Sequence, residues 1–169
     1  MLKIKRLFFI LLLITVGCTP NSQALTRNKW QLTIIPSSDN SAIEITSKNS
    51  FKVSLKNIST EKIRFWNTNN SWGYSALFFT IKNNDGKTFT VNKEPRGWRK
   101  NSPTFIEIEP NNNYVFNVAF SDNTWKIPEL SPGKYTIQAN ISITEDSKSK
   151  QLNIWTGNIN SEIYHVFVQ

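Results

Sequence analysis

Apolar and polar residues alternate with a period of two along most of the chain after residue 30. The clearest example is Phe51, Val53 and Leu55, each of which is followed by a polar residue. The same alternation recurs over residues 77–81 and 114–120. This pattern is typical of β-strands that have one face on the core and the other in water. We therefore expect strands rather than helices through this region.

Turn residues separate these alternating segments. Asp85-Gly86 lies between two of them, and it favours a hairpin with a type I′ turn because Gly tolerates a positive φ. Pro, Gly and Asn break the chain at intervals of roughly 8–12 residues. The charged segment 145–150 is expected to be a loop. This pattern predicts an all-β fold, an Ig-like antiparallel β-sandwich of about 8–10 strands.

The chain begins with three basic residues, an apolar run over residues 7–16 and then Gly17. A basic start, an apolar run and a small residue follow one another in this order in secretory signals. The run is too short for a transmembrane helix, which needs about 20 apolar residues. The chain therefore divides into a cleaved signal peptide, a polar tether and one folded domain, at residues 1–17, 18–29 and 30–169.

Cys18 is the only cysteine in the chain, and it follows the apolar run directly. A single cysteine excludes a disulfide within one molecule and a thiolate metal cluster. Segment 11–18, Leu-Leu-Leu-Ile-Thr-Val-Gly-Cys, resembles the lipobox of bacterial lipoproteins, although Thr15 stands where leucine is commonest. The resemblance implies that the signal is cut before Cys18 and that this cysteine is lipidated. The alternative is an ordinary export signal with an unmodified cysteine near the cut.

The lipobox resemblance also implies a location. A protein anchored through Cys18 is held at a membrane of the bacterial cell envelope, outside the cytoplasm. The residue after the cysteine is Thr19, whereas an aspartate at this position would resemble the inner-membrane retention signal of enteric bacteria. In a Gram-negative cell this favours the outer membrane, with the domain facing the periplasm.

The charge of the chain is modest once the signal is set aside. The chain has 20 basic and 12 acidic residues, a formal net charge of +8. Residues 1–17 hold three of the basic residues and none of the acidic ones, so the remainder carries +5. No run of five or more like charges occurs. We therefore expect no nucleic-acid partner.

Several turn motifs are arranged as in a known Ig-like family. A strand ends at Asn57, the Asp85-Gly86 hairpin follows, Pro110 precedes another strand, and Ser131-Pro132-Gly133 precedes a third. This order is similar to that of the intracellular proteinase inhibitor family of Bacillus, and it implies an Ig-like sandwich. That family carries a Tyr-Asp pair before the hairpin and a Trp-x-Trp-Ser segment after it, and this chain has neither. Protease inhibition is therefore kept only as an alternative function.

The sequence offers few residues for catalysis. His165 is the only histidine, and it lies on the expected last strand, where a surface position is commonest. No metal-binding or phosphate-binding motif occurs, so we expect no metal and no cofactor. Glu107 and Glu109 could share one face of a sheet. A carboxylate-based envelope hydrolase is therefore a second alternative, although such pairs are usually solvated.

Aromatic and basic residues gather in two segments rich in Gly and Asn. The candidate binding residues are Trp72, Tyr74, Arg96, Trp98, Arg99 and Asn101. If both loops lie at one end of the sandwich, they form an aromatic platform with a basic rim, as recognition surfaces favour. The alternative is that Trp72 and Trp98 fold inward and close that end, with their indole N–H groups bonded to loop carbonyls.

These observations together favour one class of function. The sequence predicts a lipid-anchored binding or scaffold domain of the cell envelope, without catalytic activity. Its partners are the membrane, through the lipid on Cys18, and an envelope protein or a glycan.

Overall fold

The computed structural model describes residues 29–37, 43–45, 50–99, 101–120 and 123–168. The expected signal peptide, Cys18 and the tether up to residue 28 lie outside the described residues. In the part of the chain that is described, no helix is both long and apolar enough to cross a membrane.

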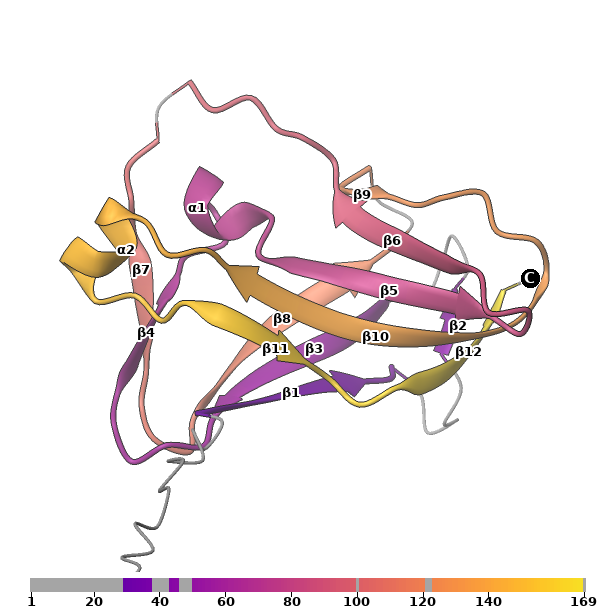
Figure 1. Cartoon of the computed structure of the whole chain (residues 1–169), viewed down its shortest axis with the longest axis horizontal. Coiled ribbons are helices and arrows are strands. Elements are labelled where there is room, and N and C mark those ends of the chain that lie inside the picture. The colour runs from indigo at the N-terminus through magenta and orange to yellow at the C-terminus, as the bar shows by residue number, and fades with distance from the viewer. Residues whose placement is uncertain (1–28, 38–42, 46–49, 100, 121–122, 169) are drawn as a thin grey trace, which may run out of the picture.

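Within these ranges the chain forms twelve strands and two short helices (Figure 1). The strands are β1 (Trp30–Ile35), β2 (Ile43–Ile45), β3 (Ser50–Asn57), β4 (Ile63–Trp66), β5 (Leu77–Asn83), β6 (Thr88–Lys93), β7 (Phe105–Ile108), β8 (Asn113–Ala119), β9 (Trp125–Lys126), β10 (Gly133–Ile143), β11 (Gly157–Asn160) and β12 (Tyr164–Val168). The helices are α1 (Ser71–Tyr74) and α2 (Ser147–Leu152). The expected all-β fold is confirmed. The strands exceed the expected number because a piece as short as β9, which has two residues, shows no alternation in the sequence.

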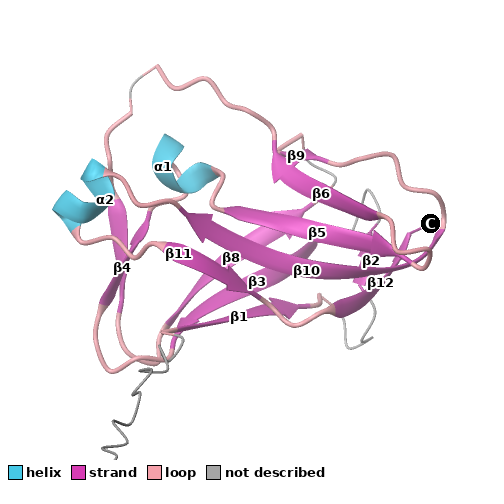
Figure 2. Ribbon diagram, viewed as in Figure 1, coloured by secondary structure: helices cyan, strands magenta, loops and turns pink. Residues whose placement is uncertain are grey.

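The strands form two main sheets and one ribbon (Figure 2). The smaller sheet has the order β1-β3-β8, and the larger has the order β2-β12-β10-β5-β6-β9, with β11 also paired to β10. Strands β4 and β7 form a separate two-stranded ribbon. The β2–β12 pair is parallel, and the other pairs are antiparallel.

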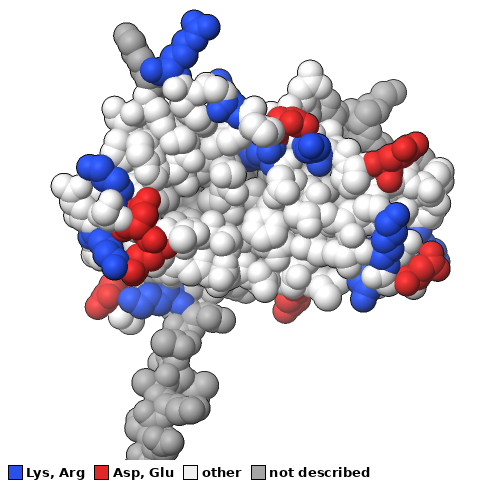
Figure 3. Space-filling model, turned by 45° about the horizontal axis from the view of Figure 1, so that its top comes forward, with Lys and Arg blue, Asp and Glu red and all other residues white. Residues whose placement is uncertain are grey.

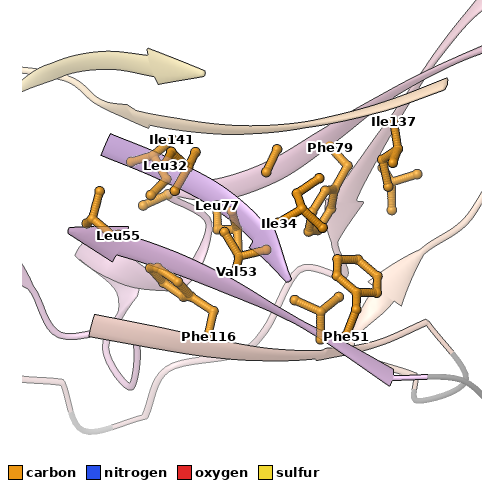
Figure 4. Close-up of a cluster of buried hydrophobic side chains, with 14 of the residues drawn as sticks. Leu32, Ile34, Phe51, Val53, Leu55, Leu77, Phe79, Phe116, Ile137 and Ile141 are labelled. Carbon is orange, nitrogen blue, oxygen red and sulfur yellow. The ribbon is translucent and has the colours of Figure 1, made fainter. Parts of the chain in front are cut away.

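The core lies between the two main sheets (Figure 4). In the smaller sheet, Val53 lies opposite Ile34 on one side and Phe116 on the other. In the larger sheet, Phe79 lies between its neighbours Ala139 and Val91. All six side chains are buried. Complete burial of each large apolar side chain contributes about 1.5–3 kcal/mol, so the alternating segments fix which face of each strand points inward.

The expected loop at residues 145–150 is wrong, because helix α2 occupies most of it. The Asp146 carboxylate accepts a hydrogen bond from the Ser149 backbone N–H at 2.6 Å. The Asp146 N–H donates in return to the Ser149 hydroxyl at 2.8 Å, which completes a capping box. Asn153 ends the helix with a left-handed φ of 53°. A helix this short shows no period of 3.6, so only its caps could have indicated it.

The Asp85-Gly86 hairpin is confirmed, but its expected turn type is wrong. The Asn83 N–H donates to the Lys87 carbonyl at 3.0 Å, and the Gly86 N–H donates to the Asn83 carbonyl at 3.1 Å. A type I′ turn needs two successive residues with positive φ. Gly86 has a φ of 84°, whereas Asp85 does not have a positive φ. The hairpin therefore closes through a single left-handed glycine.

Candidate functional site

Asn70 builds the first of the two candidate loops. Its side chain is buried, and its Oδ1 accepts hydrogen bonds from the backbone N–H groups of Trp72 and Gly73, both at 3.0 Å. These bonds start the single turn of α1, because an Asn at the N-cap satisfies otherwise unpaired helical donors. The Asn70 Nδ2 donates to the Thr104 carbonyl at 2.9 Å. Asn70 therefore fixes α1 and joins it to the end of the second loop.

A second bridge connects the same two loops. The Ser71 N–H donates to the Asn101 Oδ1 at 3.3 Å, and the Asn101 Nδ2 donates to the Ser71 hydroxyl. The structure thus brings the segment around α1 together with the segment between β6 and β7. The predicted residue Asn101 contributes to this site by holding the loops in place, and it is half-buried.

Trp72 points toward the core. It is half-buried, and its ring centroid lies 5.9 Å from that of the buried Trp66 with the planes 33° apart. The sequence left open that the loop tryptophans fold inward and close the end of the sandwich, and the Trp72 ring packs in this way. Trp72 therefore supports the loop from below and offers little surface to a ligand.

Tyr74 and Trp98 behave differently. Their ring centroids lie 5.6 Å apart in an edge-to-face contact, and neither ring belongs to the described aromatics that pack against the core. The Lys93 ammonium lies 4.7 Å from the Tyr74 ring centroid, and the Arg96 guanidinium lies 5.5 Å from that of Trp98. We call Tyr74, Lys93, Arg96, Trp98 and Arg99 the aromatic–basic surface. The sequence does not single out Lys93, because nothing local shows that β6 ends beside α1.

Two guanidinium groups of this surface have no acidic partner within the described part of the chain. Arg96 and Arg99 are exposed, and neither forms an ion pair with any of the residues that the structure describes. Figure 3 shows basic side chains dispersed over this side of the molecule, with large uncharged areas between them. Binding here would depend on individual side chains rather than on a dense positive patch. A free guanidinium beside an aromatic ring is suited to a carboxylate or a phosphate group.

The two carboxylates proposed for catalysis are engaged in ion pairs. The Lys62 ammonium lies 3.2 Å from Glu107 and 2.8 Å from Glu109, and Arg64 lies 3.0 Å from Glu107. The hydrogen bond from Arg64, followed by that from Lys62, lowers the pKa of Glu107. A glycosidase general acid needs a raised pKa instead. The arrangement therefore gives the hydrolase alternative no support.

His165 lies on β12 opposite Thr136, and its side chain is exposed. Among the described residues, no group of three or more His, Cys, Asp and Glu side chains could hold a metal ion. His165 is thus placed at the surface that the sequence favours for it.

No protein-family model matches the chain, and no curated protein matches it significantly. Its function must therefore be inferred from the arrangement of its side chains.

Proposed function

We propose that this chain is a lipid-anchored binding domain of a bacterial cell envelope, without catalytic activity. The signal-like residues 1–17 and the lipobox-like sequence at Cys18 support the anchor. Two facing sheets and the order of turn motifs support an Ig-like antiparallel sandwich as the fold of the domain. The partner is an envelope protein or a glycan that carries acidic groups.

The aromatic–basic surface carries this proposal. Trp98 and Tyr74 keep part of their rings in solvent although neither contributes to the core. The Arg96 guanidinium lies against the Trp98 ring, Arg99 follows Trp98 in the chain, and neither arginine forms an ion pair with a carboxylate that the structure describes. Tryptophan, tyrosine and arginine are the residues enriched where binding energy is concentrated in protein interfaces. An acidic partner would pair with the guanidinium groups while its apolar parts cover the rings.

The loops that carry this surface are held before any ligand binds. Asn70 is bonded to Thr104 and Ser71 is bonded to Asn101, so the end of the second loop that precedes β7 is tied to α1. A surface that is already ordered loses less conformational entropy on binding than a flexible one. The arrangement therefore favours recognition of a defined chemical group.

The test compares two double variants that remove the same charge. Arg96→Ala with Arg99→Ala alters the aromatic–basic surface, whereas Lys52→Ala with Lys134→Ala removes two exposed lysines elsewhere. The protein, purified as cells produce it, is titrated with peptidoglycan fragments and with envelope proteins. We expect the arginine variant to bind at least about tenfold more weakly, as charge-assisted hydrogen bonds are lost. Equal losses in both variants would show attraction by net charge alone and contradict the proposal.

A further inference from the structure

A polar groove of about 750 Å³ lies between β1 and β11. These strands belong to different sheets and lie on the same side of the molecule (Figure 1). The groove is lined by Trp30, Gln31, Leu32, Thr33, Ile58, Asn158, Ile159, Asn160, Glu162 and Tyr164. It shares no residue with the aromatic–basic surface, so it requires an explanation of its own.

The edge of β1 that faces the groove is not paired with any strand among the described residues, and β11 lies across the groove from it. β1 pairs only with β3, and the Ile58 N–H donates to the Lys29 carbonyl at 2.9 Å at the start of this ladder. Residues of an antiparallel strand alternate between bonding to the partner and pointing away from it. The backbone N–H and C=O groups of Trp30 and Leu32 therefore point away from β3, toward the groove.

The same reasoning applies to β11 on the other side of the groove. β11 pairs only with β10 among the described strands, and the Ser161 N–H donates to the Ala139 carbonyl at 2.9 Å just beyond this ladder. Because Ser161 bonds to β10, every second residue before it, Ile159 and Gly157, also faces β10. The backbone groups of the residues between them, Asn158 and Asn160, therefore point away from β10. Two rows of alternating donors and acceptors thus border the groove.

Trp30 lines the groove and carries a buried group without a hydrogen-bond partner among the described residues. Its side chain is 3% exposed, and its indole Nε1–H has no hydrogen-bond partner among the described residues. The ring is held edge-on by Phe65 and Trp155, at centroid distances of 6.3 and 5.8 Å. Buried donors are nearly always paired in folded proteins, so this one calls for an explanation.

We infer that the groove binds an extended peptide segment of a partner protein, which adds to the free strand edges. Only another extended backbone presents donors and acceptors in the alternating order that these edges require. A glycan would need a fully exposed aromatic face, whereas the Trp30 ring is buried and Tyr164, the other aromatic residue of the lining, is half-buried. Leu32 and Ile159 provide apolar contacts for every second side chain of the peptide. Glu162 is the single charged residue of the lining, and it selects a Lys or Arg at one end of the segment.

The probe is an array of heptapeptides with valine at alternate positions, threonine between them and one lysine moved along the sequence. The protein is used as cells produce it, and binding is followed by fluorescence polarisation and by amide hydrogen exchange. We expect one lysine position to bind best and the amides of Trp30, Leu32, Asn158 and Asn160 to become protected. Glu162→Gln should abolish the preference for that lysine position.

A matched pair of variants isolates the backbone contact. Asn158→Pro removes an N–H that faces the groove without removing a bond to β10, and it should weaken peptide binding by up to about tenfold. Asn158→Ala keeps that N–H, so the loss that Asn158→Pro shows beyond Asn158→Ala measures the backbone contact alone. Trp98→Ala should bind the peptides normally, which separates this site from the proposed function.

Three results would overturn the inference. The first is that no peptide of the array protects these amides. The second is that the amides are protected before peptide is added, which would mean that the chain itself fills the groove. The third is that Asn158→Pro and Glu162→Gln both leave binding unchanged.

Discussion

Gly73 lies directly against Asn67: a Cβ atom on Gly73 would come within 2.3 Å of the Asn67 carbonyl oxygen. The missing side chain lets α1 pack against the chain just after β4. Gly73→Ala must push the two segments apart, because a backbone oxygen cannot rotate away. We expect the free energy of unfolding to fall by about 1–3 kcal/mol in urea denaturation.

Gly97→Ala is the control for this prediction. No atom lies within 4 Å of a Cβ built on Gly97, and its φ lies outside the left-handed region. This variant should change the free energy of unfolding by less than about 0.5 kcal/mol. Equal destabilisation by both variants would show that the contact with Asn67 is not what requires Gly73.

The two loop tryptophans should differ in their effect on stability. Trp72→Ala removes a ring that packs on Trp66 and should cost about 2–3 kcal/mol, somewhat less than for a fully buried tryptophan. Trp98→Ala removes a ring outside the core and should cost less than about 1 kcal/mol while weakening ligand binding. Chemical denaturation of both variants measures the difference. A larger loss from Trp98→Ala would mean that its ring has a structural role.

Asn57 should be the most sensitive polar residue of the smaller sheet. Its Nδ2 donates to the carbonyls of Glu61 and Ile108 at 2.7 and 2.8 Å, and its Oδ1 accepts from the N–H and hydroxyl of Ser59. Asn57→Ala takes the Asn57 donor from the buried Ile108 carbonyl and removes the acceptor of Ser59, and it should cost about 2–4 kcal/mol. Asn113→Ala, at an exposed position, should cost less than about 1 kcal/mol. Similar losses in the two variants would contradict this role for Asn57.

Helix α2 should fray in acid because of its N-cap. The hydrogen bond from the Ser149 N–H lowers the pKa of Asp146 below its ordinary value. The cap therefore stabilises the folded state fully above about pH 4 and loses this effect as the pH falls through the lowered pKa. Hydrogen exchange of the Ser149 amide, corrected for its intrinsic rate, should accelerate over that lower range.

Asp146→Asn provides the control for the acid effect. The amide oxygen still accepts the bond from Ser149, but the side chain no longer titrates. The extra exchange in acid should therefore disappear while the helix remains. Its persistence in Asp146→Asn would assign the fraying to another group.

The anchor can be tested by mass spectrometry of the protein from a bacterial membrane fraction. We expect residues 1–17 to be absent and Cys18 to carry acyl chains, since each buried CH₂ contributes ~0.8 kcal/mol to membrane attachment. Cys18→Ser should remove the added mass and reduce the membrane-bound share of the protein. An unmodified Cys18, or soluble protein that retains residues 1–17, would refute the anchor.

The alternating segments made the strands predictable, whereas the site depends on contacts that the sequence does not display. Phe51, Val53 and Leu55 are buried as their spacing predicts. Trp72 and Trp98 occupy similar loops rich in Gly and Asn, so local sequence could not show that only Trp72 packs inward. The difference comes from long-range contacts, such as the bond from Asn70 to Thr104. The groove likewise depends on which strand edges remain unpaired. No single segment of the sequence shows this.

Strand β1, which directly follows Lys29, begins across the molecule from the long loop between β6 and β7 (Figure 1). If the chain leaves a bilayer at Cys18, the tether of about eleven residues between Cys18 and the domain spans no more than roughly 40 Å when fully extended. The domain would then stand close to its membrane with the long loop turned outward. Inserting residues into segment 19–28 would increase the distance from the membrane at which that loop can bind its target, and the loop itself would stay the same.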